Sequence, residues 1–489
     1  MSAAVADRRL HPGTILLRFI KEAPPAVLAL PASLGFASRA GLEKVLWIAA
    51  AIAAALLVLK WVAWRRFRYG AGESEIVIES GILSRNRRTI PFDRVQDVDV
   101  ERTFLARLFG LARVRIETGA GGKDEGLLDS VSLAEATRLR EAVRAFHAGA
   151  PAPETLSQRP PAGRLLYALG LRRLLVFGLF SFSLFYIAGF FAVLQSVDGL
   201  LPFDIYDPAR WTGLIGDYLP ARFTASAIAV VLFLAIMLGV VAGVVRTVAR
   251  DFGFRLVVEG SRFRREHGLF TRREAVIPRR RVQLAGVDTG PMRKLFGWSG
   301  LWFQTLGAGS ERSGRQAAAP FADSGEIAAV LAEAGPYRLP PPPALAMVSR
   351  RHILRSVGGK ILPLAVLIVA AALRWPQALL LLLFLPLFAA SVAVERHFHR
   401  YALDGDLLCV TRGAWRQRLW MVPLGNVQAL SLSREPLQRR LGLATLSIDT
   451  AGAPVLKGPR IVDLRNGDAE ALAARISLYA SGRKSGTDR

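Results

Sequence analysis

Cysteine and histidine are scarce in this chain of 489 residues, which has 1 cysteine, Cys409, and 6 histidines. One thiol excludes an intrachain disulfide framework and a cysteine-based zinc site. His397 and His399 are two residues apart, but no nearby carboxylate pair or cysteine completes a metal site, so we expect neither a metal nor a cofactor. The sequence also lacks a nucleophile elbow, an HExxH motif and a phosphate-binding loop, so we expect no enzymatic activity.

Acidic residues are few relative to basic ones. The chain has 39 Asp and Glu against 64 Lys and Arg, which gives a formal net charge of +25. This balance predicts an anionic partner, either a nucleic acid or an anionic lipid surface. The sequence has no zinc finger, no aromatic RNA-binding signature and no isolated basic tail, so we expect lipid and no nucleic acid.

Apolar residues make up 52% of the chain and gather in long uncharged runs. A helix needs about 20 such residues to cross a bilayer. Runs of this length lie at residues 45–64, 174–197 and 223–245. Residues 361–394 are too long for one span and predict a hairpin that turns at residues 374–376. Residues 23–37 contain three prolines. A span and an interfacial or re-entrant segment are both open there, and we favour a span because every unit then begins with two helices.

The charges around these runs predict their orientation. The loop at residues 198–222 carries four aspartates against two arginines, whereas the segments outside the second pair of runs are basic. Cytoplasmic flanks of membrane helices collect Lys and Arg. No cleavable signal peptide is evident. We therefore expect a multi-pass protein of the plasma (inner) membrane whose soluble domains face the cytoplasm.

Three soluble stretches share one signature. Intervals of 10, 5, 14 and 8 residues separate Gly, Pro, Gln, Gly and Thr in every copy. Four equal intervals in three copies indicate an internal repeat. The signature residues are Gly81, Pro91, Gln96, Gly110 and Thr118; Gly268, Pro278, Gln283, Gly297 and Thr305; and Gly413, Pro423, Gln428, Gly442 and Thr450.

The signature predicts local structure. The first glycine should turn the chain between a strand (residues 75–80, 255–259 or 407–411) and a return strand that the proline ends. The glutamine should form a structural hydrogen bond between two loops. A helical turn follows and the next glycine stops it. Residues four apart in this turn share a face, so we expect three apolar pairs to pack inward: Leu105 with Phe109, Met292 with Phe296, and Leu437 with Leu441.

These elements predict a multi-span α-helical membrane protein with three small β-barrel-like domains, each an antiparallel sheet with one C-terminal helix. The expected membrane segments are a helix pair at 1–65, a second pair at 166–250 and a hairpin at 351–398. The expected β-rich domains are 66–150, 251–338 and 399–481, with Pro-rich linkers at 151–165 and 339–350 and a tail at 482–489.

Residues 76–122, with Arg-Val-Gln after a strand-end proline and Arg-Leu-Phe-Gly before another strand, resemble the bacterial pleckstrin-homology-like (PH) domain of the YdbS/YdbT-type membrane protein family. The whole architecture is most similar to the YdbT-type members. The resemblance implies a seven-stranded, partly open barrel capped by one helix, a plasma-membrane location and no catalytic motif. Some relatives are associated with resistance to membrane-acting antimicrobial peptides. The third copy departs from the pattern at Asn426, where the others have Arg94 and Arg281.

Basic residues recur at two places in the repeat, and we take them as candidates for binding lipid or a partner. Eukaryotic PH domains resemble this pattern in placing basic residues in an early strand–strand loop. The residues after the first glycine are Arg85, Arg87, Arg88, Arg272, Arg273, Arg416 and Arg418, and those in the helical turn are Arg107, Lys294 and Arg439. The helical-turn cation has two interpretations: contact with the turn's own carbonyls and dipole, which we favour, or contact with a lipid headgroup.

Three functions compete. The favoured one is a non-catalytic scaffold whose three PH-like domains bind an anionic lipid surface or membrane protein partners, in envelope stress or antimicrobial-peptide resistance. A transporter or flippase-like component would need ionisable groups within the spans, where the sequence has Lys60 and Arg374 near the expected ends. A lipid-modifying enzyme has no identifiable catalytic set. The oligomeric state has no signature in the sequence.

Overall fold

The computed structural model describes residues 6–15, 42–82, 84–118, 126–148, 163–181, 224–305, 314–341, 344–451 and 458–484. The chain divides into two compact units. The first holds residues 1–160, 169–254 and 266–275, and the second holds residues 161–168, 255–265 and 276–489. The division passes through the second repeat, so each unit is considered by itself below.

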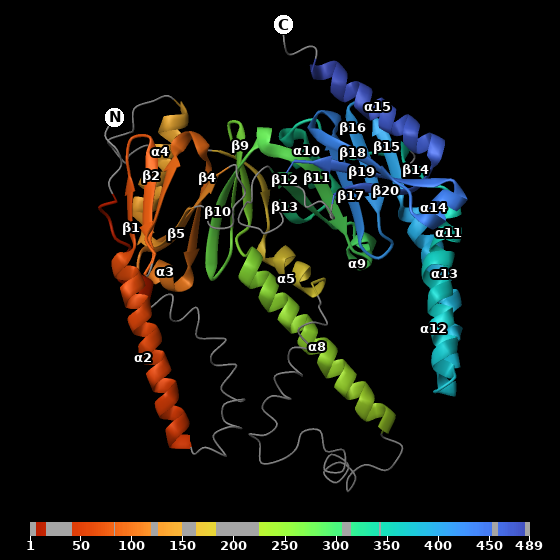
Figure 1. Cartoon of the computed structure of the whole chain (residues 1–489), viewed down its shortest axis with the longest axis horizontal. Helices are drawn as coiled ribbons and strands as arrows, with labels where there is room; N and C mark the ends of the chain where they lie inside the picture. Colours follow the sequence, from red (N-terminus) through yellow and green to blue (C-terminus); the bar gives the residue numbers. More distant parts are fainter. Residues whose placement is uncertain are drawn as a thin grey trace. The chain divides into compact units, whose positions relative to one another are not determined.

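The first repeat has six strands and closes with a helix (Figure 1). Its elements are β1 (Arg68–Ala71), β2 (Glu75–Ser80), β3 (Asn86–Pro91), the 3-10 turn η1 (Phe92–Arg94), β4 (Val95–Thr103), α3 (Phe104–Leu108), β5 (Leu111–Thr118), β6 (Gly126–Ser132) and α4 (Leu133–Ala148). Ser132 caps α4 by accepting a bond from the backbone of Glu135 at 3.2 Å. Leu139 and Val143 on one face of α4 are buried in the core.

The second and third repeats follow the same order, which confirms the internal repeat and its antiparallel sheets. The second consists of β8 (Arg255–Glu259), β9 (Arg262–His267), β10 (Thr271–Pro278), η4 (Arg279–Arg281), β11 (Val282–Thr289), α9 (Pro291–Leu295), β12 (Ser299–Thr305), β13 (Arg315–Ala322) and α10 (Ser324–Ala334). The third consists of β15 (Arg400–Asp404), β16 (Leu407–Arg412), β17 (Gln417–Pro423), η8 (Leu424–Asn426), β18 (Val427–Ser433), α14 (Pro436–Leu441), β19 (Leu443–Thr450), β20 (Arg460–Arg465) and α15 (Asn466–Lys484).

One strand assignment from the sequence is wrong. The strand that leads into the Gly268 turn is β9, whereas residues 255–259 form β8, one strand earlier. The sequence interpretation missed that two strands precede the turn in each repeat. Gly260, with φ of 57°, allows the chain to reverse between β8 and β9.

Strands of neighbouring repeats pair with each other. In the first unit the order is β6-β5-β4-β10, so β4 of the first repeat pairs with the return strand of the second. In the second unit the order is β13-β12-β11-β17-β16-β15-β14, with β11 paired to β17. The sheets therefore continue between repeats instead of closing into the expected separate barrels. The 3-10 turn after each signature proline separates the return strand from the strand that follows it, so these two strands do not pair with each other. Each of them therefore has an edge that can pair with a strand of a neighbouring repeat.

An ion pair crosses each of these junctions at the same repeat position. Arg273 lies opposite Glu101 in the β4–β10 register, and its Nε is 2.7 Å from the Glu101 carboxylate. Arg418 lies opposite Asp288 in the β11–β17 register, at 3.6 Å. Arg416 contacts the same Asp288 carboxylate at 3.1 Å. Oppositely charged residues directly across a strand pair favour one register over its neighbours.

A short strand precedes each helical segment and pairs with the first strand that follows it. Arg8 forms a bridge to Tyr69 of β1, β7 (Arg164–Ala168) pairs with β8, and β14 (Ala346–Met347) pairs with β15. Residues 164–168 and 346–347 were expected within Pro-rich linkers and at the start of a membrane helix. They are strands because they complete the edge of the sheet that the chain rejoins after the helices.

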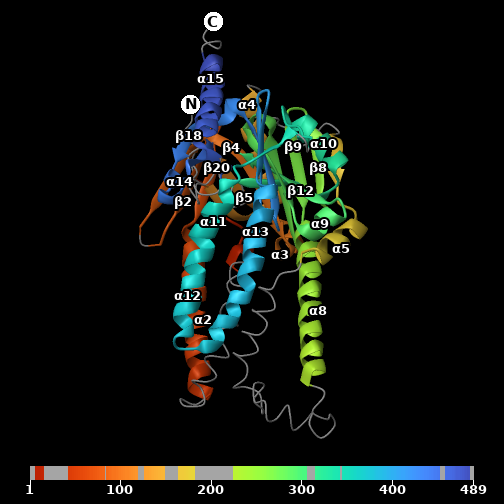
Figure 2. The ribbon, with the colours of Figure 1, turned by 90° about the vertical axis from the view of Figure 1, so that its right-hand side faces the viewer.

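Three described helices are long and apolar enough to cross a membrane: Phe233–Asp251, Arg351–Ala372 and Pro376–Phe398. The first belongs to α8 (Thr224–Asp251). The other two comprise α11 (Arg351–Ser356), the π-helical η6 (Val357–Ile361), α12 (Leu362–Ala372), η7 (Pro376–Phe384) and α13 (Leu385–Phe398). They lie side by side as the expected hairpin, turning at residues 373–375 (Figure 2). The run at 45–64 lies in α2 (Leu42–Arg66), and that at 174–197 begins in α5 (Leu171–Leu179). The expected segment at 23–37, most of 174–197 and the loop at 198–222 lie outside the described residues.

The first signature glycine has a backbone that other residues rarely adopt. Its φ is 119° at Gly81, 110° at Gly268 and 98° at Gly413. In each case a Cβ would overlap the carbonyl oxygen three residues later. We expect Gly268→Ala to destabilise the full chain by about 1–3 kcal/mol, measured as a lower melting temperature.

Gly290→Ala is the matched control, because Gly290 has φ of -91° and no heavy atom within 4 Å of an added Cβ. Equal melting temperatures for the two variants would contradict the assignment of Gly268 to a strained turn.

Candidate membrane-interface site

The helical turns α3 and α9 expose their large apolar residues. The exposed fractions are 58% for Phe104, 71% for Leu108 and 48% for Phe109, and 58% for Met292, 76% for Leu295 and 58% for Phe296. The expectation that the pairs Leu105–Phe109 and Met292–Phe296 pack inward is therefore wrong. A single helical turn has one inward position, and in α3 this is Ala106. In α14 it is Gln438, while Leu437 and Leu441 are half-buried.

The strand turns after the first signature glycine also expose an apolar residue. Phe270 is 55% exposed and Trp415 is 76% exposed, each two residues after its glycine. The equivalent residue of the first repeat is Leu83, which lies outside the described residues. The sequence analysis missed this position. Its signal was present, because an apolar residue recurs two residues after the same glycine in all three copies.

The helical turn of every repeat is connected to the end of a candidate membrane helix, directly in the second and third repeats and through Leu269 in the first. Arg107 donates to the carbonyl of Leu269 at 3.3 Å, and the backbone N–H of Leu269 donates to Ala249, near the end of α8. Lys294 places its Nζ 4.5 Å from the ring centroid of Phe398, the last residue of α13. These contacts place the apolar turns at the ends of the repeats that adjoin candidate membrane helices.

The third repeat makes the corresponding contact with the beginning of the hairpin. Arg351, the first residue of α11, donates to the carbonyl of Leu441 at the end of α14, at 2.7 Å. Arg66 at the end of α2 similarly donates to the carbonyl of Ile82 in the first strand turn, at 2.7 Å. We call the strand turn and the helical turn of each repeat, taken repeat by repeat, its membrane-proximal face.

The candidate arginines of the strand turns lie on this face, and ion pairs engage several of them. Arg87 is 3.8 Å from Glu79 and Arg272 is 2.7 Å from Glu266. Arg273, Arg416 and Arg418 form the junction pairs described above. Arg85 and Arg88 are exposed on the outer edge of the first repeat.

The cations of the helical turns are exposed at Arg107, Lys294 and Arg439. Arg107 and Lys294 contact other elements, and Arg439 donates to the carbonyl of Arg434, which precedes its turn, at 3.2 Å. In the described structure the side-chain bonds of Arg107 and Arg439 and the ring contact of Lys294 go to other residues, not to the last carbonyls of their own turns. The contacts thus give no direct support to the interpretation favoured from the sequence, in which each cation binds the carbonyls of its own turn.

The remaining signature residues have structural positions. The glycines that end the helical turns, Gly110, Gly297 and Gly442, have φ between 65° and 72°. Gln283 is buried and donates to the carbonyl of Arg281 at 3.4 Å, whereas Gln428 is exposed, so neither is seen to join two loops. The side chain of Gln96 lies outside the described residues.

A buried polar cluster attaches the hairpin to the third repeat. Asp463 of β20 is fully buried and accepts bonds from His352 and Arg355 of α11, the latter at 2.7 Å. Gln438 of α14 donates to its other oxygen at 2.7 Å. Burial raises the pKa of Asp463, but the bonds from His352 and Gln438 and the charge of Arg355 outweigh it and leave the pKa below its ordinary value. The charged carboxylate thus joins the first turn of the hairpin to the helical turn.

His399 lies beside this cluster and is 1% exposed. Burial, followed by the charges of Arg412 and His352, lowers its pKa to about 3. Its Nε2 accepts a bond from the backbone of Val462 at 3.4 Å, which requires the neutral ring. The exposed His397 instead contacts Arg400. Among the residues the structure describes, no three His, Cys, Asp or Glu side chains are grouped to hold a metal.

Comparison with known proteins follows the same repeat pattern. A family model described as bacterial PH domain matches residues 25–147, 205–335 and 358–480. The chain belongs to the bacterial PH domain family. Each match begins before the strands of its repeat, so the PH repeat of this family includes part of the helical segment ahead of it.

Two curated proteins of Bacillus subtilis (strain 168) are similar to this PH-domain chain. It is 25% identical to the UPF0699 transmembrane protein YdbT over 321 residues, which are 62% of this chain and 63% of YdbT. It is 32% identical to the UPF0699 transmembrane protein YdbS over 103 residues, which are 21% of this chain and 62% of YdbS. The matches span less than two thirds of each relative. No solved structure matches the chain.

The low pKa of His399 predicts acid sensitivity of the third PH repeat. A histidine whose pKa is lower in the folded chain than the unfolded value near 6.5 favours folding above pH 6.5, and this advantage is lost as the pH falls toward the folded pKa. Between about pH 7.5 and about pH 5.5, His399 should lower the unfolding free energy by about 1.4 kcal/mol. Thermal melting of the full chain in detergent measures the change.

His399→Gln should reduce this loss, because glutamine can accept the Val462 bond without titrating. His397→Gln changes the exposed neighbouring histidine and should keep the full loss. An equal acid response in both variants would show that His399 is not its source.

Proposed function

We propose that this chain is a non-catalytic scaffold of the plasma (inner) membrane whose three PH repeats rest on the anionic headgroup surface of the cytoplasmic leaflet. From there they would hold membrane protein partners. A role in envelope stress or in resistance to membrane-acting antimicrobial peptides would follow from occupying the surface that such peptides attack.

The membrane-proximal face carries this proposal. Its turns expose apolar and aromatic side chains, such as Leu295 and Trp415, beside basic ones, and they contact the ends of candidate membrane helices. Aromatic residues favour the bilayer interface, and cations there contact lipid phosphates. Apolar side chains that are exposed at the same place in successive repeats usually mark a surface that binds a membrane or another protein.

The energies favour many weak contacts over one strong site. Full burial of a large apolar side chain is worth about 1.5–3 kcal/mol, and each cation near an anionic surface about 1 kcal/mol. Three repeats on one chain, anchored by helices, raise the effective concentration of each contact at the surface. The net charge of +25 acts in the same direction.

The pairing of the segments that flank each helical segment supports the placement of all three repeats on the same side of the membrane. Arg8 with Tyr69, β7 with β8, and β14 with β15 pair the chain before and after each segment. A chain that leaves and rejoins the same sheet must return to the side from which it left. The excess of Lys and Arg in the segments outside the second pair of apolar runs supports the cytoplasm as that side.

A transporter role is the second candidate, and one observation bears on it. Lys360 and Glu395 join the two arms of the hairpin at 3.6 Å. Glu395 lies three residues before the end of its candidate span at Phe398. An ion pair so near the span end suits an interfacial clamp better than a transport pathway at the bilayer centre.

A fluorophore on α9 tests the surface proposal in the full chain. Cys409 is buried and its pKa is raised to about 12 by burial, so it should not label. We expect an environment-sensitive dye at Leu295→Cys to shift its emission to the blue in proteoliposomes, more with phosphatidylglycerol than with phosphatidylcholine alone. Lys294→Glu should remove about 2 kcal/mol of surface attraction, and with it the effect of the anionic lipid.

Ser261→Cys is the matched control. Ser261 is exposed and bonds to Arg279 at the other end of β11, about 25 Å from α9 along the strand. The dye should report water at this position in both membranes. The same water-like emission at positions 261 and 295 would refute docking of the repeats on the lipid surface.

A further inference from the structure

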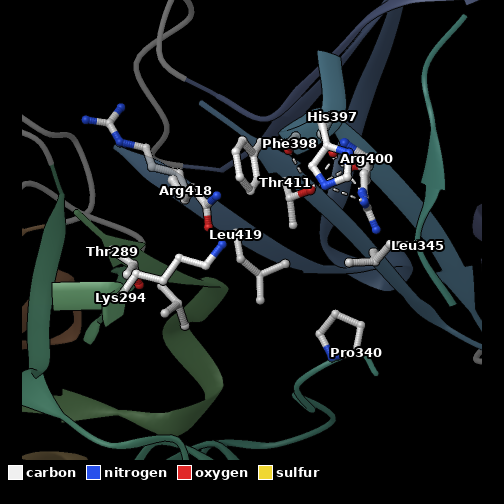
Figure 3. Close-up of a pocket in the computed structure, with 12 residues that line it drawn as sticks. Thr289, Lys294, Pro340, Leu345, His397, Phe398, Arg400, Thr411, Arg418 and Leu419 are labelled. Carbon is white, nitrogen blue, oxygen red and sulfur yellow. Dashed lines mark hydrogen bonds between the residues drawn. The ribbon is translucent and has the colours of Figure 1, made fainter. Parts of the chain in front are cut away.

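A pocket of about 360 Å³ opens between the second and third repeats within the second unit. Lys294 of α9 contributes one wall and Arg400 of β15 contributes the opposite one, with Phe398 and Leu419 between them (Figure 3). This volume is within the range of about 300–1,000 Å³ that small-ligand sites occupy. We call it the inter-repeat pocket.

The polar groups of the inter-repeat pocket are cationic or neutral. Lys294, Arg400 and Arg418 line it, and no Asp or Glu does so among the residues that the structure describes. Arg418 has a carboxylate partner outside the lining, Asp288 at 3.6 Å. Lys294 contacts the ring of Phe398, and Arg400 donates to the carbonyl of His397 at 2.8 Å. Neither Lys294 nor Arg400 forms an ion pair with a carboxylate in the described part of the chain. The hydroxyls of Thr289 and Thr411 add neutral donors to the same walls.

The equivalent positions of the first junction are built differently. The repeat spacing aligns Thr411 with Glu266 and Leu419 with Glu274. Those two glutamates pair with Arg272 at 2.7 Å and with Arg140 at 2.6 Å. The first junction thus has two carboxylates at positions where the second has Thr411 and Leu419. Without them, Lys294 and Arg400 face the open volume of the pocket with no carboxylate partner among the described residues. An external anion is the natural counter-ion there.

The apolar lining of the pocket and its location at the end of a candidate membrane helix indicate which kind of anion it would bind. Val287, Leu345, Phe398 and Leu419 line the pocket beside the cations, and Phe398 ends the candidate span Pro376–Phe398. A free phosphate would leave these apolar walls in water, whereas a lipid would cover them with its glycerol and the first part of its acyl chains. The pocket lies where the headgroup of a lipid beside α13 would be.

We propose that the inter-repeat pocket binds the phosphate of one anionic phospholipid between Lys294 and Arg400. The proposal rests on the membrane-surface function proposed above and adds a single, specific lipid site to it. The ammonium and the guanidinium both donate to phosphate oxygens, and the apolar walls hold the glycerol end of the same molecule.

Native mass spectrometry of the full chain in mild detergent tests the pocket. After incubation with phosphatidylglycerol, the protein should retain lipid in preference to phosphatidylethanolamine. The double variant Lys294→Ala, Arg400→Ala should retain about tenfold less phosphatidylglycerol. Leu419→Glu installs the carboxylate of the first junction and should cause a similar loss.

Arg255→Ala is the matched control, because Arg255 begins β8 at the position of Arg400 and does not line the pocket. It should retain lipid as the wild type does, and Lys294→Arg should preserve both lipid retention and melting temperature. Undiminished retention by both the double variant and Leu419→Glu would overturn the site.

Soluble glycerol 3-phosphate distinguishes the source of the phosphate. If it displaces phosphatidylglycerol as effectively as added lipid does, the pocket takes a free phosphate ester and the lipid assignment is overturned. The dye at position 295 separates this outcome from the surface proposal. A blue shift that persists in Leu419→Glu, together with wild-type lipid retention by both that variant and the double variant, would refute the pocket and leave surface docking intact.

Discussion

The pairing of strands across repeat junctions is the constraint on which the rest of this structure depends. β4 with β10 and β11 with β17 join the half-sheet of one repeat to the half-sheet of the next. A cross-strand ion pair at the same repeat position, Arg273 with Glu101 and Arg418 with Asp288, sets the register of both junctions. The positions of the turns, and so of the membrane-proximal face, follow from that register.

The junctions also explain why the candidate arginines do not all have one role. Residues of the strand turns that looked alike in the sequence divide into junction partners, such as Arg273 and Arg418, and exposed residues, such as Arg85. The helical-turn cations remain available on the surface, next to apolar neighbours. Charge in this chain therefore joins the repeats to one another at the junctions and also lies beside the exposed apolar residues of the helical turns.

Spacing and local chemistry predicted much of the fold. The glycines with positive φ, the strand-ending prolines, the Ser132 cap and the hairpin turn after α12 are properties of short segments and could be read directly. The prediction that Leu105 and Phe109 pack inward was wrong. Residues four apart share a face of a helix, but a single helical turn is too short for its sequence pattern to show which face packs against the core. The pairing between repeats could not be predicted in this way. The alternation of apolar and polar residues shows which face of a strand is buried, but it does not show which strand pairs with its edge. Arg273 and Glu101, which pair across the first junction, are 172 residues apart in the sequence.

The two outer edges of the array show how its length is limited. Among the described strands, β3 has β2 as its one neighbour in the sheet order, and β18 has β19. By the repeat spacing, Asn86 of β3 takes the place of Arg273 and Arg418, and Ser433 of β18 takes the place of Glu101 and Asp288. Neither end carries the charge that aligns a junction, and Arg87 and Arg88 make the β3 edge unfavourable for another strand. A further junction at β3 or β18 would therefore lack the cross-strand ion pair that aligns both inner junctions, although it would use the same strand positions.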